Sequence, residues 1–156
     1  MGMMERILRL MGEKQASDVY LSAGAPALIR IHGECVPINS QMLPPNAPRD
    51  LLAEVVSPER MEELEETGEL NLAIPLAGVG RFRISAMRQC GTYAVVIRFI
   101  SYQVPELASL NMPAALGEIV LQKRGLVLVV GATGSGKSTT LAAMIDKRNS
   151  ELTGHI

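Results

Sequence analysis

Nine consecutive residues of the 156-residue sequence have the types and spacing that bind phosphate. They are Gly131, Ala132, Thr133, Gly134, Ser135, Gly136, Lys137, Ser138 and Thr139, which match the pattern G-x-x-x-x-G-K-[ST] at every required position. The glycines permit backbone conformations that turn successive N–H groups inward, forming a nest for phosphate oxygens. Lys137 would bring a positive charge to the β- and γ-phosphates, and the Ser138 hydroxyl would ligate Mg²⁺. Thr139 either contacts the α-phosphate or is an ordinary residue of a helix N-terminus.

The segments on both sides of this loop supply the context that the pattern needs. Residues 125–130 are a continuous run of Leu and β-branched residues after Gly125, which is typical of a strand buried on both faces. Residues 140–148 contain neither Gly nor Pro and are rich in helix formers, so they predict a helix. The positive end of that helix dipole would face the phosphates. The sequence therefore predicts ATP or ADP, with Mg²⁺, as the ligand of this loop.

Composition narrows the class of protein. A hydrophobic content of 47% with 20% charged residues indicates a globular chain, and a net charge of −1 gives no basic surface for nucleic acid. Two cysteines without C-x-x-C spacing and two histidines, His32 and His155, do not suggest a zinc cluster, so the thiols are expected to be reduced, as in a cytosolic protein. No stretch is long enough to span a bilayer and no signal peptide is visible, so membrane association would come through a partner.

The first hundred residues predict an α+β domain. A helical stripe covers residues 3–13, a strand covers 17–21, and a hairpin joins 27–32 to 34–38. Two short helices are expected at 49–56 and 58–67, the second with Ser57 as N-cap and Gly68 as its stop. Three strands follow at 70–76, 81–88 and 92–100, giving helices segregated from an antiparallel sheet within residues 1–100.

The remaining residues predict the beginning of a second domain. Residues 101–112 are expected to be a linker, followed by a helix at 113–123, the strand at 125–130, the loop, its helix and a turn at 149–154. One strand and two helices do not make a P-loop domain, which needs several parallel strands covered on both faces. We therefore expect residues 113–156 to be the start of an α/β domain that continues beyond Ile156.

Several stretches together carry a resemblance to a known family. They are ASDVYLS at residues 16–22, GRFRI at 80–84, RGLVL at 124–128 and GATGSGKSTTLAA at 131–143. With them the chain resembles the type IV pilus retraction ATPases of the secretion-ATPase superfamily, along residues 5–156. Residues 71–83 and Ala132, where the main retraction motor usually has proline, are more similar to the PilU branch than to the PilT branch.

The resemblance implies an architecture and an activity. Residues 1–100 would be a PAS-like N-terminal domain, and residues 113–156 the start of a RecA-like ATPase core. The family forms homohexamers on the cytoplasmic face of the inner membrane, binds nucleotide between the two domains, and uses ATP hydrolysis to depolymerise the pilus, which produces twitching motility. The implied partners are further copies of the chain, a paralogous retraction motor and the inner-membrane platform protein of the pilus.

Three arginines are candidates for a catalytic role beside Lys137. Arg81 and Arg83 alternate on one strand and Arg98 lies near the end of the next. The resemblance implies that basic residues of the first domain approach the γ-phosphate, where a cation would stabilise the charge of the transition state. Each of the three also fits a solvated or ion-paired strand residue, and that alternative is left open.

The resemblance also implies which parts of the ATPase lie outside this sequence. The acidic segment with the catalytic Glu, the Walker B strand and the His box of the family all come after Ile156. We therefore expect residues 1–156 alone to be inactive and the full-length protein to hydrolyse ATP. Two other functions stay open: a regulatory module that binds a partner motor and carries a vestigial P-loop, and a type II secretion or pilus-assembly ATPase.

Other polar residues have structural explanations. Cys35 is expected to be packed in the core and Cys90 to lie exposed at a turn. The glutamates at 62, 63, 65 and 66 are expected to form a solvated helix face close to Arg60.

Overall fold

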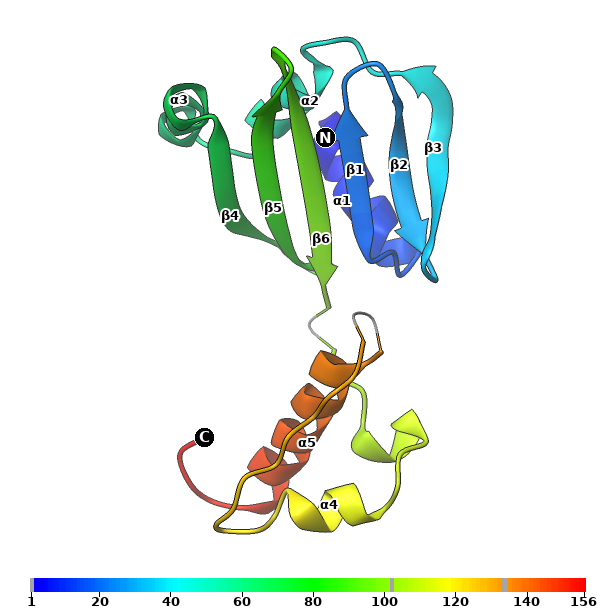
Figure 1. Ribbon diagram of the computed structural model, residues 1–156, viewed down its shortest axis with the longest axis vertical. Coiled ribbons are helices and arrows are strands. Elements are labelled where there is room, and N and C mark those ends of the chain that lie inside the picture. The colour runs from blue at the N-terminus through cyan, green and yellow to red at the C-terminus, as the bar shows by residue number, and fades with distance from the viewer. Residues whose placement is uncertain (1, 102, 133–134) are drawn as a thin grey trace. The chain divides into compact units, whose positions relative to one another are not determined.

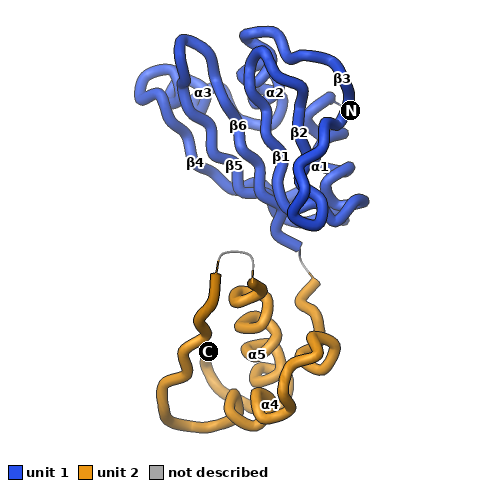
Figure 2. The backbone as a smooth tube through the Cα atoms, turned by 45° about the vertical axis from the view of Figure 1, so that its right-hand side comes forward, with its two compact units in different colours: residues 1–102 blue, residues 103–156 orange. Residues whose placement is uncertain are grey.

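The computed structural model describes residues 2–101, 103–132 and 135–156. The chain divides into two compact units, residues 1–102 and residues 103–156, which carry different colours in Figure 2. Thr133 and Gly134 of the predicted loop lie outside the described residues. Each unit is described by itself.

Unit 1 is an α+β structure built on one antiparallel sheet of six strands (Figure 1). Its elements are α1 (Met3–Glu13), β1 (Asp18–Ser22), β2 (Pro26–Ile31), β3 (Glu34–Met42), α2 (Ala47–Ala53), α3 (Pro58–Thr67), β4 (Glu69–Leu76), β5 (Gly80–Gln89) and β6 (Thr92–Ile100). The strand order is β3-β2-β1-β6-β5-β4, so the hairpin β2–β3 and the meander β4–β5–β6 meet where β1 pairs with β6. The predicted α+β class, three helices and six strands of this segment are confirmed, with ends within two residues except at the C-terminal ends of β3 and α2.

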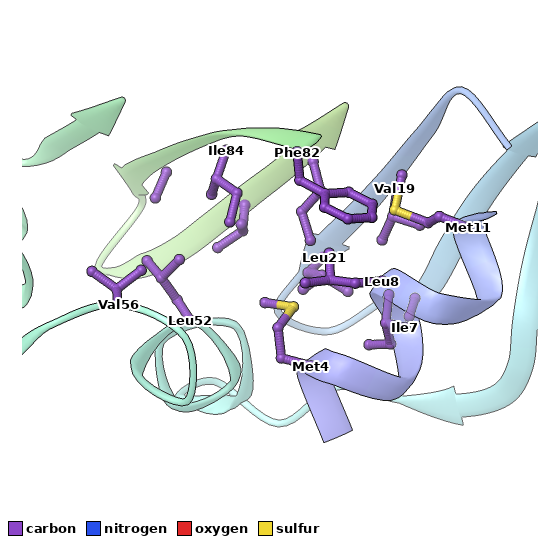
Figure 3. Close-up of a cluster of buried hydrophobic side chains, with 14 of the residues drawn as sticks. Met4, Ile7, Leu8, Met11, Val19, Leu21, Leu52, Val56, Phe82 and Ile84 are labelled. Carbon is purple, nitrogen blue, oxygen red and sulfur yellow. The ribbon is translucent and has the colours of Figure 1, made fainter. Parts of the chain in front are cut away.

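The core of unit 1 lies between the helices and one face of the sheet (Figure 3). The helix α1 buries the stripe that the sequence predicted, at Met4, Ile7, Leu8 and Met11. From the sheet, alternate residues of β1, β5 and β6 point into the same cluster; they are Val19, Leu21, Phe82, Ile84, Val95 and Ile97. Because side chains alternate along a strand, the intervening residues belong to the opposite face.

The helix α3 begins and ends where the sequence indicated. Ser57 is its N-cap residue in an extended conformation, and Pro58 occupies the first helical turn. The Ser57 side chain makes no capping hydrogen bond. At the other end Gly68 adopts a left-handed conformation with φ of 81°, and its N–H donates to the Leu64 carbonyl. This is the conformation that favours glycine after a helix.

The prediction that Cys35 is packed in the core is wrong. Cys35 lies on β3, which is an edge strand of the sheet, and its side chain is exposed. Every residue of β3 except the half-buried Ile38 is exposed, so this strand contributes no buried residue to the core. Cys90 is exposed at the β5–β6 turn, as predicted, with φ of 49°.

Within residues 103–132 and 135–156, unit 2 has a 3₁₀ helix and two α-helices: η1 (Leu107–Leu110), α4 (Ala115–Ile119) and α5 (Lys137–Glu151). The helix after the loop is confirmed and runs to Glu151, so the predicted turn from residue 149 is wrong in its first three positions. The predicted helix at 113–123 is shorter, since α4 covers five residues, and the predicted linker at 101–112 includes η1.

The prediction of a buried strand at 125–130 is also wrong for this chain. These residues form no strand, and Leu126, Leu128 and Val130 are 83%, 73% and 85% exposed. A strand needs a neighbour for its backbone hydrogen bonds and a layer on each face for its side chains. The described residues of unit 2 place no other strand beside this segment.

Candidate phosphate-binding site

The N-terminus of α5 provides the backbone donors of the candidate site. Gly136 is the N-cap residue, with φ of 88°, a left-handed conformation that a side chain disfavours. The first hydrogen bond of the helix runs from the Thr140 N–H to the Gly136 carbonyl, at 2.8 Å. The N–H groups of Lys137, Ser138 and Thr139 precede that bond and therefore have no acceptor within the helix. Three donors and the positive end of the helix dipole thus face one point, as an anion requires.

Two donors of the loop and the helix share one acceptor, the carbonyl oxygen of Ala132. The Lys137 Nζ donates to this oxygen at 2.6 Å, and the Ser135 N–H donates to it at 3.2 Å. Gly131 lies so close to the other end of the loop that a Cβ atom there would stand 2.6 Å from the Ser135 Oγ. Glycine at 131 is favoured by its φ of 157°, and a side chain there would also have to displace the Ser135 hydroxyl.

Ser138 and Thr139 are exposed in the first turn of α5. The Ser138 hydroxyl is therefore accessible for a cation held with a phosphate, which is the role that the sequence predicts. The two interpretations of Thr139 stay open, because an exposed first-turn residue fits both. Thr140, one position further, is buried and belongs to the packing of the helix.

The rest of unit 2 holds α5 in place. Ala143 and Met144 are buried on one side of the helix. The Arg148 Nη1 donates to the carbonyl of Val120 at 2.7 Å and to the carbonyl of Gln122 at 3.2 Å. These bonds join the last turns of α5 to the residues that follow α4. They hold the C-terminal end of the helix whose N-terminal N–H groups are the candidate phosphate ligands.

The candidate arginines lie in unit 1, on the sheet face opposite the core. Arg81 and Arg83 alternate with the buried residues Gly80, Phe82 and Ile84 on β5, as predicted. Arg83 is directly opposite Arg98 of β6, and the Arg98 Nε donates to the Asp18 Oδ1 at 3.0 Å. The structure thus brings Arg83 and Arg98 together, and Arg81 lies two positions along the same strand.

The sequence did not single out Asp18 and Arg30, which lie beside these arginines in the structure. Asp18 is buried although charged, and it accepts from Arg98 on one side while Arg30 Nη1 lies 3.6 Å from it on the other. The Arg30 guanidinium stands 5.2 Å from the centre of the Tyr20 ring. Burial, with a smaller contribution from Asp18, raises the pKa of Tyr20 above its ordinary value. No local sequence signal could have found this cluster, because Arg98 is 80 positions from Asp18 and meets it only through the pairing of β1 with β6.

Other site classes find little support in the described residues. No three His, Cys, Asp or Glu side chains among them are grouped so as to hold a metal ion. In the same part of the chain, no helix combines the length and the apolar character needed to cross a membrane. The glutamates of α3 lie largely on its exposed side, where Glu63 pairs with Arg60 and Glu65 pairs with Arg49.

The comparisons with known proteins agree on one family. The family model described as "Type II/IV secretion system protein" matches residues 3–153. The type IV pilus ATPase PilU of Pseudomonas aeruginosa is 43% identical over 152 residues, which are 97% of this chain and 40% of PilU. The type IV pilus retraction ATPase PilT of the same organism is 37% identical over 150 residues, 96% of this chain and 44% of PilT.

Solved structures agree with the sequence relatives. The crystal structure of the pilus retraction motor PilT with bound ADP has a TM-score of 0.77 and 37% identity, covering 96% of this chain and 43% of that one. The ATPase DotB of Legionella pneumophila has a TM-score of 0.73 and 28% identity, covering 91% of this chain and 41% of DotB. The chain thus spans about two fifths of the length of these relatives. It belongs to the Type II/IV secretion system protein family, as a PilT/PilU-like chain that is more similar to PilU than to PilT.

Proposed function

We propose that this chain is the nucleotide-binding portion of a motor ATPase that powers retraction of a type IV pilus. The observation that supports the proposal is the N-terminus of α5, where the N–H groups of Lys137, Ser138 and Thr139 have no acceptor within the helix and follow Gly136, whose φ is 88°. The relatives named as pilus ATPases, and the ADP bound in the PilT crystal structure, support this choice of ligand and process.

The finer parts of the proposal rest on the family resemblance. Residues 1–100 are a PAS-like domain, residues 101–112 a linker, and residues 113–156 the beginning of a RecA-like core. The full-length protein is a homohexamer at the cytoplasmic face of the inner membrane, working with a paralogous motor and the platform protein. The two-unit division of the structure at residue 102 is compatible with this arrangement.

The residues of the loop and of the first turn of α5 would contact the phosphates of the nucleotide. The amides of Lys137, Ser138 and Thr139 donate to phosphate oxygens, and the Lys137 ammonium exchanges the Ala132 carbonyl for an anionic oxygen, which is the stronger acceptor. The Ser138 hydroxyl is available as a ligand of Mg²⁺, which neutralises phosphate charge when it is bound with the nucleotide. Arg81, Arg83 and Arg98 are proposed sources of further positive charge at the γ-phosphate.

Nucleotide titration of the 156-residue chain tests this proposal. We expect a fluorescent ATP analogue to bind in the presence of Mg²⁺, and Lys137→Ala to weaken that binding by about tenfold or more, since a charge-assisted contact is lost. Lys123→Ala is the matched control, because it removes an exposed lysine from the same unit without touching the loop. Equal binding by both variants would overturn the proposal and favour the regulatory module with a vestigial P-loop.

Hydrolysis separates this chain from the complete motor. A P-loop positions phosphate but supplies only part of phosphoryl transfer. We therefore expect residues 1–156 to release phosphate from ATP no faster than their Lys137→Ala variant, and the full-length protein to hydrolyse ATP in a Lys137-dependent manner. Turnover by the short chain above the variant's level would contradict the inactivity that we propose.

A further inference from the structure

A cavity of about 390 Å³ lies in unit 1 between α1, α2 and the edge strand β3. Its lining includes Ile7 of α1, which is labelled in Figure 3, and Ala27 of β2. These two residues are 8% and 7% exposed and belong to the core cluster. Ile38, Leu43 and Leu51 are half-buried apolar residues that also line the cavity and pack against the same cluster. The α1–α2–β3 cavity thus leads from the surface to the hydrophobic core.

A bulge in β3 forms one wall of this cavity. The β2–β3 ladder is regular as far as the pair Leu28–Pro37, and the next pair is Pro26–Met42. One residue of β2, Ala27, is therefore opposite residues 38–41 of β3, and the extra residues leave the regular ladder. Ala27 and three of these four residues line the cavity. Bulges are frequent beside functional sites, where they change the direction of side chains.

Two carboxylates of α2 make the lining of the cavity negative. Asp50 and Glu54 both line it and are one helical turn apart, a spacing at which like charges destabilise a helix. The Glu54 Oε2 accepts the Met4 N–H at 2.8 Å, which holds this carboxylate in place. The ion pair of Asp50 with Arg49 is long, at 3.8 Å, and Arg49 also pairs with Glu65. Because none of the described residues that line the cavity is Lys, Arg or His, a net negative charge is left for a ligand to compensate.

These features select a class of ligand. Ligand cavities of roughly 300–1,000 Å³ combine apolar walls with a few polar groups that set the orientation of the ligand. A volume near the lower end of this range suits one ring or a short alkyl chain. Two carboxylates repel phosphates and carboxylic acids and attract an ammonium group. The side-chain amides of Asn39, Gln41 and Asn46, which are exposed residues of the lining, supply further acceptors for its N–H groups.

We propose that the α1–α2–β3 cavity binds a small amphipathic amine, with the apolar body against Ile7, Ala27 and Ile38 and the ammonium group at Asp50 and Glu54. A free small molecule fits better than a protein segment, because the cavity leads inward to residues of the core. All of its lining belongs to unit 1, whereas the phosphate-binding loop belongs to unit 2 and takes an anion. Amine binding is therefore independent of the nucleotide binding proposed above.

Two ligands with the same body and opposite charge test this assignment. 4-Phenylbutylamine is a cation at pH 7, and 4-phenylbutyrate is an anion. We expect NMR titration of the 156-residue chain to show binding of the amine with a Kd of about 1 mM or below, and binding of the acid that is at least about tenfold weaker. The amide shifts should be centred on Ile7, Ala27 and Ile38, while residues 137–140 stay unchanged.

Three variants connect the binding to the cavity. Asp50→Asn should weaken binding of the amine by about tenfold, because a charge-assisted contact is lost. Glu62→Gln removes an exposed carboxylate of α3 outside the cavity and should bind the amine like the wild type. Ala47→Leu enlarges a half-buried side chain of the lining at the start of α2 and should weaken binding by at least about tenfold, because it fills space that the ligand needs. Circular dichroism verifies folding, and the exposed position Asp50 decides the outcome if Ala47→Leu does not fold.

Several results would overturn the proposal. One is no detectable binding of the amine at about 10 mM, since a ligand of this size should reach millimolar affinity in a matching cavity. Another is equal binding of the amine and the acid, which would mean that the carboxylates do not contribute. Binding that Asp50→Asn leaves unchanged, or amide shifts centred on unit 2, would place the amine elsewhere. A lysine-containing apolar peptide that binds the cavity when the amine does not would assign it to a protein partner instead.

Discussion

Asp18 is the buried carboxylate that pairs with two arginines of unit 1. It is 5% exposed, and its two oxygens face Arg98 at 3.0 Å and Arg30 at 3.6 Å, while the Ser17 hydroxyl donates to it at 2.9 Å. A buried carboxylate is tolerated because these donors replace water. Without it, three guanidinium groups would stand in one row with no anion between them.

Replacing Asp18 should therefore cost measurable stability. We expect Asp18→Asn to lower the free energy of unfolding by about 1–3 kcal/mol, since a buried acceptor of charged hydrogen bonds is lost while both arginines remain. Urea unfolding of the 156-residue chain measures this change. Asp50→Asn is the control, because Asp50 is 66% exposed and its ion pair with Arg49 is long, at 3.8 Å. This substitution should change the free energy of unfolding by less than about 0.5 kcal/mol. Equal effects of the two substitutions would contradict this account of Asp18.

At the scale of elements, the helix α1 shows how one stripe of side chains fixes the position of a helix. Met4, Leu8 and Met11 are almost fully buried against the sheet, and the Glu54 Oε2 accepts the Met4 N–H at 2.8 Å. The Glu54 carboxylate thus satisfies an N–H in the first turn of α1, and a negative charge is favourable at that end of a helix. The helix is held both by burial of its apolar side and by a partner for its first turn.

Two adjacent methionines of α1 allow a matched test of this packing. Met4 is fully buried and Met3 is 55% exposed. We expect Met4→Ala to lower the free energy of unfolding by about 2–5 kcal/mol, because it leaves a cavity in the core, and Met3→Ala to lower it by less than about 1 kcal/mol. Denaturant titration compares the two. A larger loss at Met3 than at Met4 would mean that α1 buries a different side.

At the scale of the whole molecule, the two units differ in how much apolar surface they bury. Unit 1 has one continuous cluster that includes residues from all of its helices and from the central strands. In the described part of unit 2, the buried hydrophobic residues are Ala143 and Met144, while the apolar run at 125–130 is largely exposed. Resistance to local unfolding follows buried apolar contacts and paired backbone groups. The two units should therefore open independently, with unit 2 less stable.

Hydrogen exchange should reveal this difference directly. We expect amides of β5 and β6 to be protected by at least about 100-fold more than those of residues 125–130, which have no strand partner. Mass spectrometry of peptides from the 156-residue chain measures both regions in one sample. The same segment in the full-length protein serves as the comparison and should gain protection if it pairs with strands of a larger core. Slow exchange at 125–130 in the short chain would contradict the prediction.

The amino-acid sequence by itself determined the features that depend on near neighbours. Each of these features depends on residues that are close in the sequence. They are the apolar stripe of α1, the end of α3 at Gly68, the hairpin around Gly33 and the spacing of the phosphate-binding loop. Such patterns reflect local conformational preference and the periodicity of burial, so they are visible before the chain folds.

Only the tertiary structure decided the features that depend on distant neighbours. Asp18 and Arg98 are 80 positions apart and meet because β1 pairs with β6 in one register. Cys35 is exposed because β3 lies at the edge of the sheet and places no buried residue in the core. Residues 125–130 form no strand because none of the described residues pairs with them. Strand order, register and edges are set by pairing across the whole sheet, and no local pattern encodes which strand will be next to which.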